Sequence, residues 1–393
     1  MTKPKTRKIN LGNAIVIAGV TLIIGIFVGI NWNNVAGSFL PYLGFKTSSA
    51  NDWSALDEVY KELSHKYDGT VDKAAAIEGA KKGIAASVGD VYTSYMTAEE
   101  ATDFNKSLHG DVGSGIGVVL AKRDGYIRIV RTLPDNPASR AGILAGDIIY
   151  KIDGEAVYNL DADNIATKLR GASGTEVELS VVRDGEEKSF KLTREPINNV
   201  SAYVDYNGNT AIVHVTRFDN DTGTIIRDFT KEFSGKGINK VILDLRDNGG
   251  GYVSAARDLL SLWIDSKAIL IQKSSKLPDD TTYAAHGQAT LSDMKTIVLV
   301  NGSTASASEI VAGALKDYNK ATIIGETTYG KGVVQQLVNL SGGTLLKVTT
   351  AHWYTPNGNT INGTGITPDI EVVRSYDDIN KNRDPQLDKA LAY

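Results

Sequence analysis

Apolar residues follow different patterns along the chain, and each pattern predicts different elements. Residues 51–105 carry apolar side chains at helical spacing, including Leu56, Val59 and Leu63, which predicts a small helical domain. Residues 106–195 instead hold short apolar runs separated by glycine-rich turns. That second pattern predicts a domain built mainly of short strands.

The rest of the chain, residues 196–393, alternates fully apolar runs with helical stretches. One such run is residues 296–300, and the last helical stretch is 384–392. Strands that are apolar on both faces are typical of a buried parallel sheet covered by helices. The pattern therefore predicts a multi-domain protein whose largest domain has an α/β fold with a mostly parallel sheet.

The first fifty residues predict a membrane anchor. Four basic residues lie in the cytoplasmic segment 1–10, and no charged residue occurs in 11–30. That length suits a transmembrane helix, and the basic flank places the body outside the cytoplasm. Residues 31–50 are expected to form a tether. A cleaved signal peptide with small residues at 35–38 is the alternative, but the apolar run is longer than such peptides usually have.

Charge and cysteine content exclude several functions. The net charge is −4, and the four basic charges near the amino terminus leave −8 for the remaining residues. No basic tract marks the body, which argues against a nucleic-acid partner. The chain contains no cysteine, so thiol catalysis, disulfides and cysteine-bound zinc are excluded.

Two short segments carry the candidate chemistry. Gly302–Glu309 reads GSTASASE and Gly330–Gln335 reads GKGVVQ, with Ser306 and Lys331 25 positions apart. Ser306 follows an apolar strand and precedes a helical stretch, so backbone N–H groups at the helix start can face negative charge. A serine activated by an uncharged lysine is a known nucleophile arrangement. Ser303 and Ser308 compete for this role, although Ser308 better fits a helix N-cap.

Lys331 can act as a base only without its proton, which requires burial that lowers its pKa. The stretch from Gly325 to Lys331 also has the spacing of a phosphate-binding loop. Gly332, however, occupies the position where that loop needs Ser or Thr, and a strand rather than a helix is predicted to follow. A nucleotide is therefore not expected.

The histidines form neither a recognisable catalytic triad motif nor an H-E-x-x-H zinc motif. We interpret all five as structural or surface residues. Distance along the sequence alone does not separate His286 and His352 from the site that contains Ser306. The five histidines are His65, His109, His214, His286 and His352.

Together with the segment Asp244–Gly251 (DLRDNGGG), these motifs make residues 51 to 392 resemble the carboxyl-terminal processing, or tail-specific, serine proteases. The resemblance implies a nucleophile at Ser306, a base at Lys331 and an orienting amide at Gln335. It implies oxyanion donors at Gly249 or Gly250 and at Ala307, and no metal or cofactor. Gly249 stands where the family commonly has proline, which departs from the pattern.

Residues 106–195 resemble a PDZ domain. In such domains a glycine-containing loop, here Gly115, Ile116, Gly117 and Val118, offers N–H groups to a peptide carboxylate. The peptide then adds as a strand to the sheet edge, beside a helix expected at 161–169.

The sequence thus predicts a membrane-anchored, extracytoplasmic serine endopeptidase that acts on proteins with apolar carboxyl-terminal tails. The alternative from another class is a non-catalytic adaptor that binds tails through its PDZ domain. The helices at 51–105 and 384–392 are candidates for contacts in a homodimer.

Overall fold

A computed structural model describes residues 20–22, 25–26, 53–123, 125–276, 279–381 and 383–393. The predicted membrane helix 11–30 therefore lies mostly outside the described residues. Within the described ranges, no helix combines the length and the apolar character needed to cross a membrane.

The chain divides into two compact units, residues 1–80 and 81–393. In the first unit, α3 (Ser54–Lys66) has the predicted helical form but buries none of its residues. Its apolar side chains Leu56, Val59 and Leu63 stay 45%, 58% and 49% exposed. Helix α4 (Lys73–Ala86) begins in this unit and ends in the second.

After the end of α4, the second unit continues with a short strand and a helix. Strand β1 (Ser94–Met96) precedes α5 (Ala98–Leu108), whose N-cap Thr97 accepts a hydrogen bond from the Glu100 N–H. Helical spacing predicted α5 but not β1, because a strand of three residues is too short to show an alternating pattern.

Residues 114–196 form two antiparallel sheets and two helices. The elements are β2 (Ser114–Gly115), β3 (Val118–Arg123), β4 (Tyr126–Thr132), α6 (Pro137–Arg140), β5 (Ile148–Ile152), β6 (Glu155–Ala156), α7 (Ala162–Leu169), β7 (Glu176–Arg183), β8 (Glu186–Thr193) and β9 (Glu195–Pro196). The main sheet has the order β3-β4-β5-β7-β8 and is antiparallel. Its core includes Ile129, Ile165 and Leu179, all almost fully buried. The helix expected at 161–169 is α7, and Asp161 is its N-cap.

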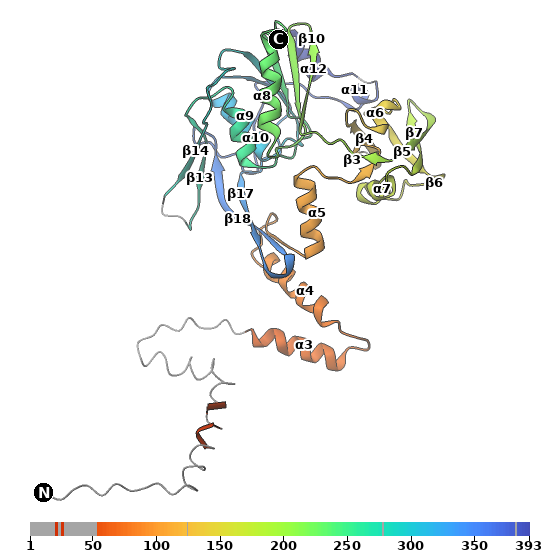
Figure 1. Ribbon diagram of the computed structural model, residues 1–393, viewed down its shortest axis with the longest axis vertical. Coiled ribbons are helices and arrows are strands. Elements are labelled where there is room, and N and C mark those ends of the chain that lie inside the picture. The colour runs from red at the N-terminus through yellow and green to blue at the C-terminus, as the bar shows by residue number, and fades with distance from the viewer. Residues whose placement is uncertain (1–19, 23–24, 27–52, 124, 277–278, 382) are drawn as a thin grey trace, which may run out of the picture. The chain divides into compact units, whose positions relative to one another are not determined.

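The next part is the predicted α/β fold (Figure 1). Its elements are β10 (Ala202–Asn207), β11 (Thr210–Val215), α8 (Thr222–Phe233), β12 (Lys240–Asp244), α9 (Val253–Leu260), β15 (Lys295–Val300), α10 (Ala307–Asp317), β16 (Thr322–Gly325), β19 (Ile370–Glu371), α11 (Tyr376–Asn380) and α12 (Pro385–Ala392). The sheet has the order β10-β11-β12-β15-β16-β19, and every pair except β10 with β11 is parallel.

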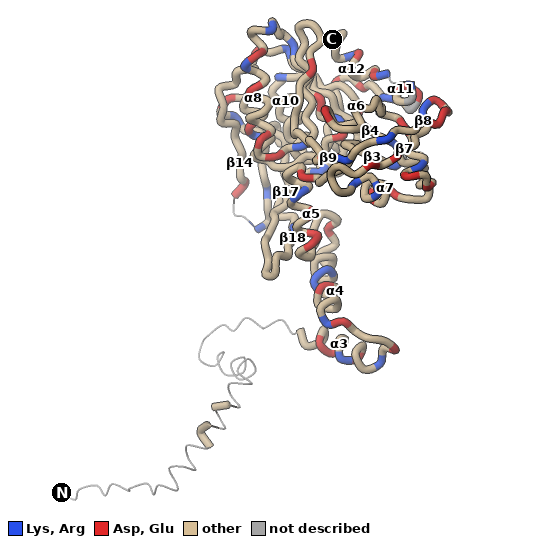
Figure 2. The backbone as a smooth tube through the Cα atoms, turned by 45° about the vertical axis from the view of Figure 1, so that its right-hand side comes forward, with Lys and Arg blue, Asp and Glu red and all other residues tan. Residues whose placement is uncertain are grey.

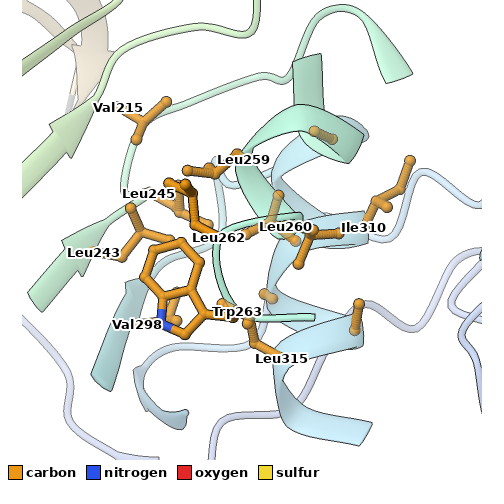
Figure 3. Packing of buried hydrophobic residues seen from close by; sticks show 14 of the residues in the cluster. Val215, Leu243, Leu245, Leu259, Leu260, Leu262, Trp263, Val298, Ile310 and Leu315 are labelled. Carbon is orange, nitrogen blue, oxygen red and sulfur yellow. The ribbon is translucent and has the colours of Figure 1, made fainter. Parts of the chain in front are cut away.

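Helices cover both faces of this sheet, which explains why its central strands β12 and β15 are almost entirely apolar. On one face, Trp263 and Leu315 pack with Leu243 and Val298 from the sheet, as Figure 3 shows. On the other face, Ala390 of α12 packs on a second cluster that includes Ile242.

A second sheet, which the sequence pattern does not reveal, lies beside the first. It joins β1 to β13 (Ala268–Lys273), β14 (Thr281–Ala284), β17 (Val333–Asn339) and β18 (Leu345–Tyr354), and all of its pairs are antiparallel. The short 3-10 turn Ser341–Gly343 connects β17 to β18. Acidic and basic residues are interspersed over this unit (Figure 2), in keeping with the absence of a basic tract.

Candidate active site

Ser306 occupies a constrained turn between β15 and α10. Its backbone angles, φ 57° and ψ −118°, lie in a region that non-glycine residues rarely adopt. Ser306 is itself the N-cap of α10, so the expectation that Ser308 is the cap is wrong. Ser308 instead lies inside the helix, fully buried, and donates a hydrogen bond to the Asn248 carbonyl at 3.0 Å. A strained strand-to-helix turn of this kind is where activated serines project from α/β sheets.

The buried carboxylate of Glu309 fixes this turn and the lysine loop together. Its Oε2 accepts from the backbone N–H groups of Ser306 at 2.8 Å and Lys331 at 2.9 Å. Its Oε1 accepts from the Thr328 hydroxyl and the Gly330 N–H, both at 2.6 Å. Glu309 has no exposed surface. Four donors therefore satisfy a carboxylate that water does not reach, and the two predicted catalytic segments share one anchor.

Lys331 is half-buried, and two side chains, Gln335 and Tyr92, contact its ammonium group. Its Nζ donates to Gln335 Oε1 at 2.6 Å, and the Gln335 amide donates to the Tyr92 carbonyl at 2.6 Å. The Nζ also lies 5.3 Å from the centroid of the Tyr92 ring. Burial lowers the pKa of Lys331 below its usual value, and the positive charge of Lys347 lowers it further. Nearby Glu309 acts in the opposite direction on this pKa.

One cavity of about 520 Å³ brings together the predicted site residues that are far apart in sequence. Ser306, Lys331, Gln335, Gly249 and Gly250 all line it. The serine comes from the β15–α10 turn, the lysine from the loop just before β17, the glutamine from β17 itself, and the glycines from the turn after β12. The cavity is large enough to hold several residues of a peptide.

The glycine turn closes tightly on the serine turn. A side chain on Gly250 would meet Ser306 Cβ at 2.7 Å and the Ala307 nitrogen at 2.9 Å. The Gly250 N–H already donates to Asn248 Oδ1 at 2.9 Å, so it is engaged in this structure. Of the two glycines, Gly249 is therefore the better match for the predicted oxyanion donor beside Ala307.

The competing residues lie elsewhere. Ser303 is exposed and donates its N–H to Asn301 Oδ1. Among the described residues that line the cavity, none is a histidine. His214 lies between Asp205 and Asp244, whose carboxylates raise its pKa to about 9 in spite of burial.

His286 and the segment after Lys331 also bear on the predictions from the sequence. His286 pairs with Asp258 at 3.0 Å. The segment after Lys331 is strand β17, which differs from the helix that follows a phosphate-binding loop.

The glycine loop of residues 114–196 borders a separate groove. Gly115, Ile116, Gly117 and Val118 line it, facing Ala166 and Leu169 of α7. Gly117 has a φ of 77°, and a side chain there would overlap Asn136, so the loop requires glycine at this position. Ile116 is only 2% exposed and belongs mainly to the core, which leaves Val118 as the more accessible apolar residue.

The fold and the site define a serine peptidase of α/β architecture that carries a PDZ domain. A family model for the PDZ domain matches residues 114–193, and one for peptidase family S41 matches residues 209–372. A probable CtpA-like serine protease of Staphylococcus aureus is 34% identical over 364 residues, covering 92% of this chain and 71% of that protein. This chain belongs to peptidase family S41 and is a serine protease of its C-terminal processing group.

Solved structures agree with this assignment. The photosystem II D1 C-terminal processing protease superposes with a TM-score of 0.57 at 27% identity, covering 84% of this chain and 90% of that one. A putative S41 protease from Bacteroides fragilis has a TM-score of 0.56 at 17% identity, covering 88% and 98%, and shows the shared fold alone.

Sequence reasoning missed several residues at the site. Glu309 is visible in the sequence only as an acidic residue in the first turn of a helix. Tyr92 and Lys347 carry no sequence signal at all, because they reach Lys331 only through the pairing of β1 with β18 and of β18 with β17.

Proposed function

We propose that this chain is an endopeptidase in which Ser306 is the nucleophile and Lys331 the general base. The observation that supports this assignment most directly is the shared cavity, which collects both residues, Gln335 and the glycine turn from separate elements. The lowered pKa of Lys331 supports it further, since a neutral amine can accept the serine proton.

In the proposed mechanism, the Ser306 hydroxyl attacks the scissile carbonyl carbon while Lys331 Nζ takes the hydroxyl proton. The oxyanion that forms is stabilised by the N–H groups of Ala307 and of Gly249, since the Gly250 N–H is engaged by Asn248. Lys331 then returns the proton to the leaving amine as the C–N bond breaks. Water next attacks the acyl ester and gives a proton to Lys331. Lys331 passes this proton to Ser306 Oγ as the ester C–O bond breaks, which releases the acid and restores the neutral lysine. Gln335 orients the lysine amine through its hydrogen bond.

We further propose that the Gly115–Val118 loop binds the carboxyl terminus of protein substrates with apolar tails. Residues 11–30 would anchor the chain in the cell membrane with the protease body outside the cytoplasm, as the sequence pattern suggests. The D1 C-terminal processing protease, as its name states, processes a carboxyl terminus, which supports substrates of this kind.

Replacing Ser306 tests the assignment. Ser306→Ala should abolish peptide cleavage and labelling by a fluorophosphonate while the melting temperature stays close to that of the wild type. Ser303→Ala is the matched control in the same turn region and should keep both activities. Labelling that persists in Ser306→Ala, or wild-type protein that binds tails but neither cleaves peptides nor reacts, would favour the adaptor alternative.

A further inference from the structure

The catalytic cavity is positively charged, which the proposed mechanism does not require. Of the described residues that line it, three are cationic, namely Arg217, Lys331 and Lys347, and none is Asp or Glu. Most of the other lining side chains are apolar, including Phe104, Ile310, Val333, Leu337 and Trp353. A site of this composition favours a ligand that is apolar but carries a negative group.

Two of the three cations are already committed. Lys331 Nζ donates to Gln335 and is assigned to proton transfer. Arg217 uses Nη2 in an ion pair of 2.8 Å with Asp219. Its Nε and Nη1 lack acceptors within the described chain, but both are enclosed by protein, so an incoming ligand does not reach them without rearrangement.

Lys347 differs from both. It lies half-buried on β18, where it pairs with Leu337 of β17 and with Ser94 of β1. Within the described ranges, no carboxylate forms an ion pair with Lys347. Its Nζ instead lies 5.5 Å from the centroid of the Phe104 ring, on the wall of the cavity. An ammonium group packed on an aromatic ring and bordering a cleft is ready to accept a charged partner.

We propose that Lys347 is a specificity-determining residue that binds a carboxylate of the peptide held in the catalytic cleft. This carboxylate is either an acidic side chain near the scissile bond or the carboxyl terminus of a short peptide. The inference rests on the proposed function, because it names the substrate class of the same cleft. It differs from tail binding by the Gly115–Val118 loop, which lines another groove.

The surroundings of Lys347 explain why it favours a carboxylate over a neutral amide. Lys347 is half-buried, and most of the cleft lining is apolar, so a charge-assisted hydrogen bond there is stronger than at the surface. A neutral amide in the same place leaves the ammonium group without its counter-ion. Replacing Glu by Gln at the recognised position should therefore lower kcat/KM about tenfold, the effect of about 1.4 kcal/mol.

The test uses the full-length protein and a peptide series blocked at both ends, with a single Glu or a single Gln at each position around the scissile bond. A second series contains no acidic residue and ends either in a free acid or in an amide. The wild type should prefer the acid member at one position or at the free terminus, and the series that shows the preference identifies the source of the carboxylate.

Variants then assign the preference to Lys347. Lys347→Met and Lys347→Gln should bring the ratio of kcat/KM for the acid peptide to kcat/KM for the amide peptide close to one. Lys347→Arg should keep the wild-type ratio. Lys188→Met removes one exposed positive charge from β8 and should keep the wild-type ratio. The ratio is informative because a change in Lys331 protonation alters kcat/KM equally for both peptides. Lost recognition of the carboxylate lowers kcat/KM for the acid peptide only.

The proposal is overturned if the wild type cleaves acid and amide peptides equally at every position, or if Lys347→Met and Lys347→Gln both keep the ratio. Failure of the proposed function has a different signature, because no peptide is cleaved and Ser306 does not react with fluorophosphonate. In that case, the same peptides are given a fluorescent label, and fluorescence anisotropy measures the ratio of their binding constants, acid member to amide member.

Discussion

At the scale of single residues, the proposed mechanism depends on a lysine that its surroundings make less basic. Burial is the largest influence on Lys331, and Lys347 on β18 adds repulsion that further disfavours the charged form. Glu309 on α10 and Asp90 before β1 act in the opposite direction. Because the first two influences prevail, the pKa of Lys331 is lowered, and a larger share of the amine is neutral near physiological pH.

This balance predicts the pH dependence of cleavage. Rates should rise with pH as Lys331 loses its proton, with a midpoint below the value of about 10.4 for a solvated lysine. Lys347→Met removes the repelling charge, so the pKa of Lys331 should increase and the midpoint should move to higher pH. Rates measured across pH with a peptide that lacks acidic residues would check both statements. A midpoint that stays unchanged in Lys347→Met would contradict the coupling.

Lys331→Arg is the control for this prediction. A guanidinium stays protonated at these pH values, so this variant should be inactive although it keeps the charge. Near-normal activity in Lys331→Arg would show that another group accepts the proton.

At the scale of elements, the sequence predicted what local patterns encode. The apolar run of β15, the helical spacing of α10 and the strand after Lys331 are all confirmed. The antiparallel sheet was not predicted, because β1 joins β18 across some 250 intervening residues and only three-dimensional pairing reveals it. The same long-range pairing explains why Tyr92 and Lys347 went unnoticed, whereas Ser306 and Lys331 stand in recognisable local motifs.

Glu309 in the first turn of α10 binds both the turn that contains Ser306 and the loop that contains Lys331. Glu309→Gln should lower both the melting temperature and the rate of fluorophosphonate labelling. A glutamine has one acceptor oxygen where the carboxylate has two, and its NH₂ group would face donors such as the N–H of Lys331. Leaving buried donors unpaired costs about 1–3 kcal/mol each.

Glu99→Gln provides a matched control, since Glu99 also lies in the first turn of a helix, α5, but is exposed. That variant should change neither quantity measurably. Wild-type labelling and stability in Glu309→Gln would mean that the carboxylate does not hold the two catalytic segments in place.

At the scale of the whole molecule, the PDZ groove and the catalytic cleft meet. Thr216 and Arg217 line both cavities, so the segment between β11 and α8 forms a wall common to the two. A tail held in the groove would therefore keep the preceding part of the same substrate near the cleft. Such tethering raises the effective concentration of a cleavable segment without new contacts at Ser306.

This arrangement predicts that a long unfolded substrate with an apolar tail loses about tenfold or more in kcat/KM when its last carboxylate is amidated. Gly117→Val should remove this difference, because its φ of 77° and the overlap of a side chain with Asn136 distort the carboxylate loop. Gly185→Val, at a φ of 82° in the β7–β8 turn and away from the groove, is the matched control and should keep the difference. Short peptides that end within the cleft should be cleaved equally by wild type and Gly117→Val, which separates tail capture from recognition at Lys347. Equal cleavage of the free-acid and amidated long substrates by the wild type would show that the groove does not deliver substrate through its carboxylate.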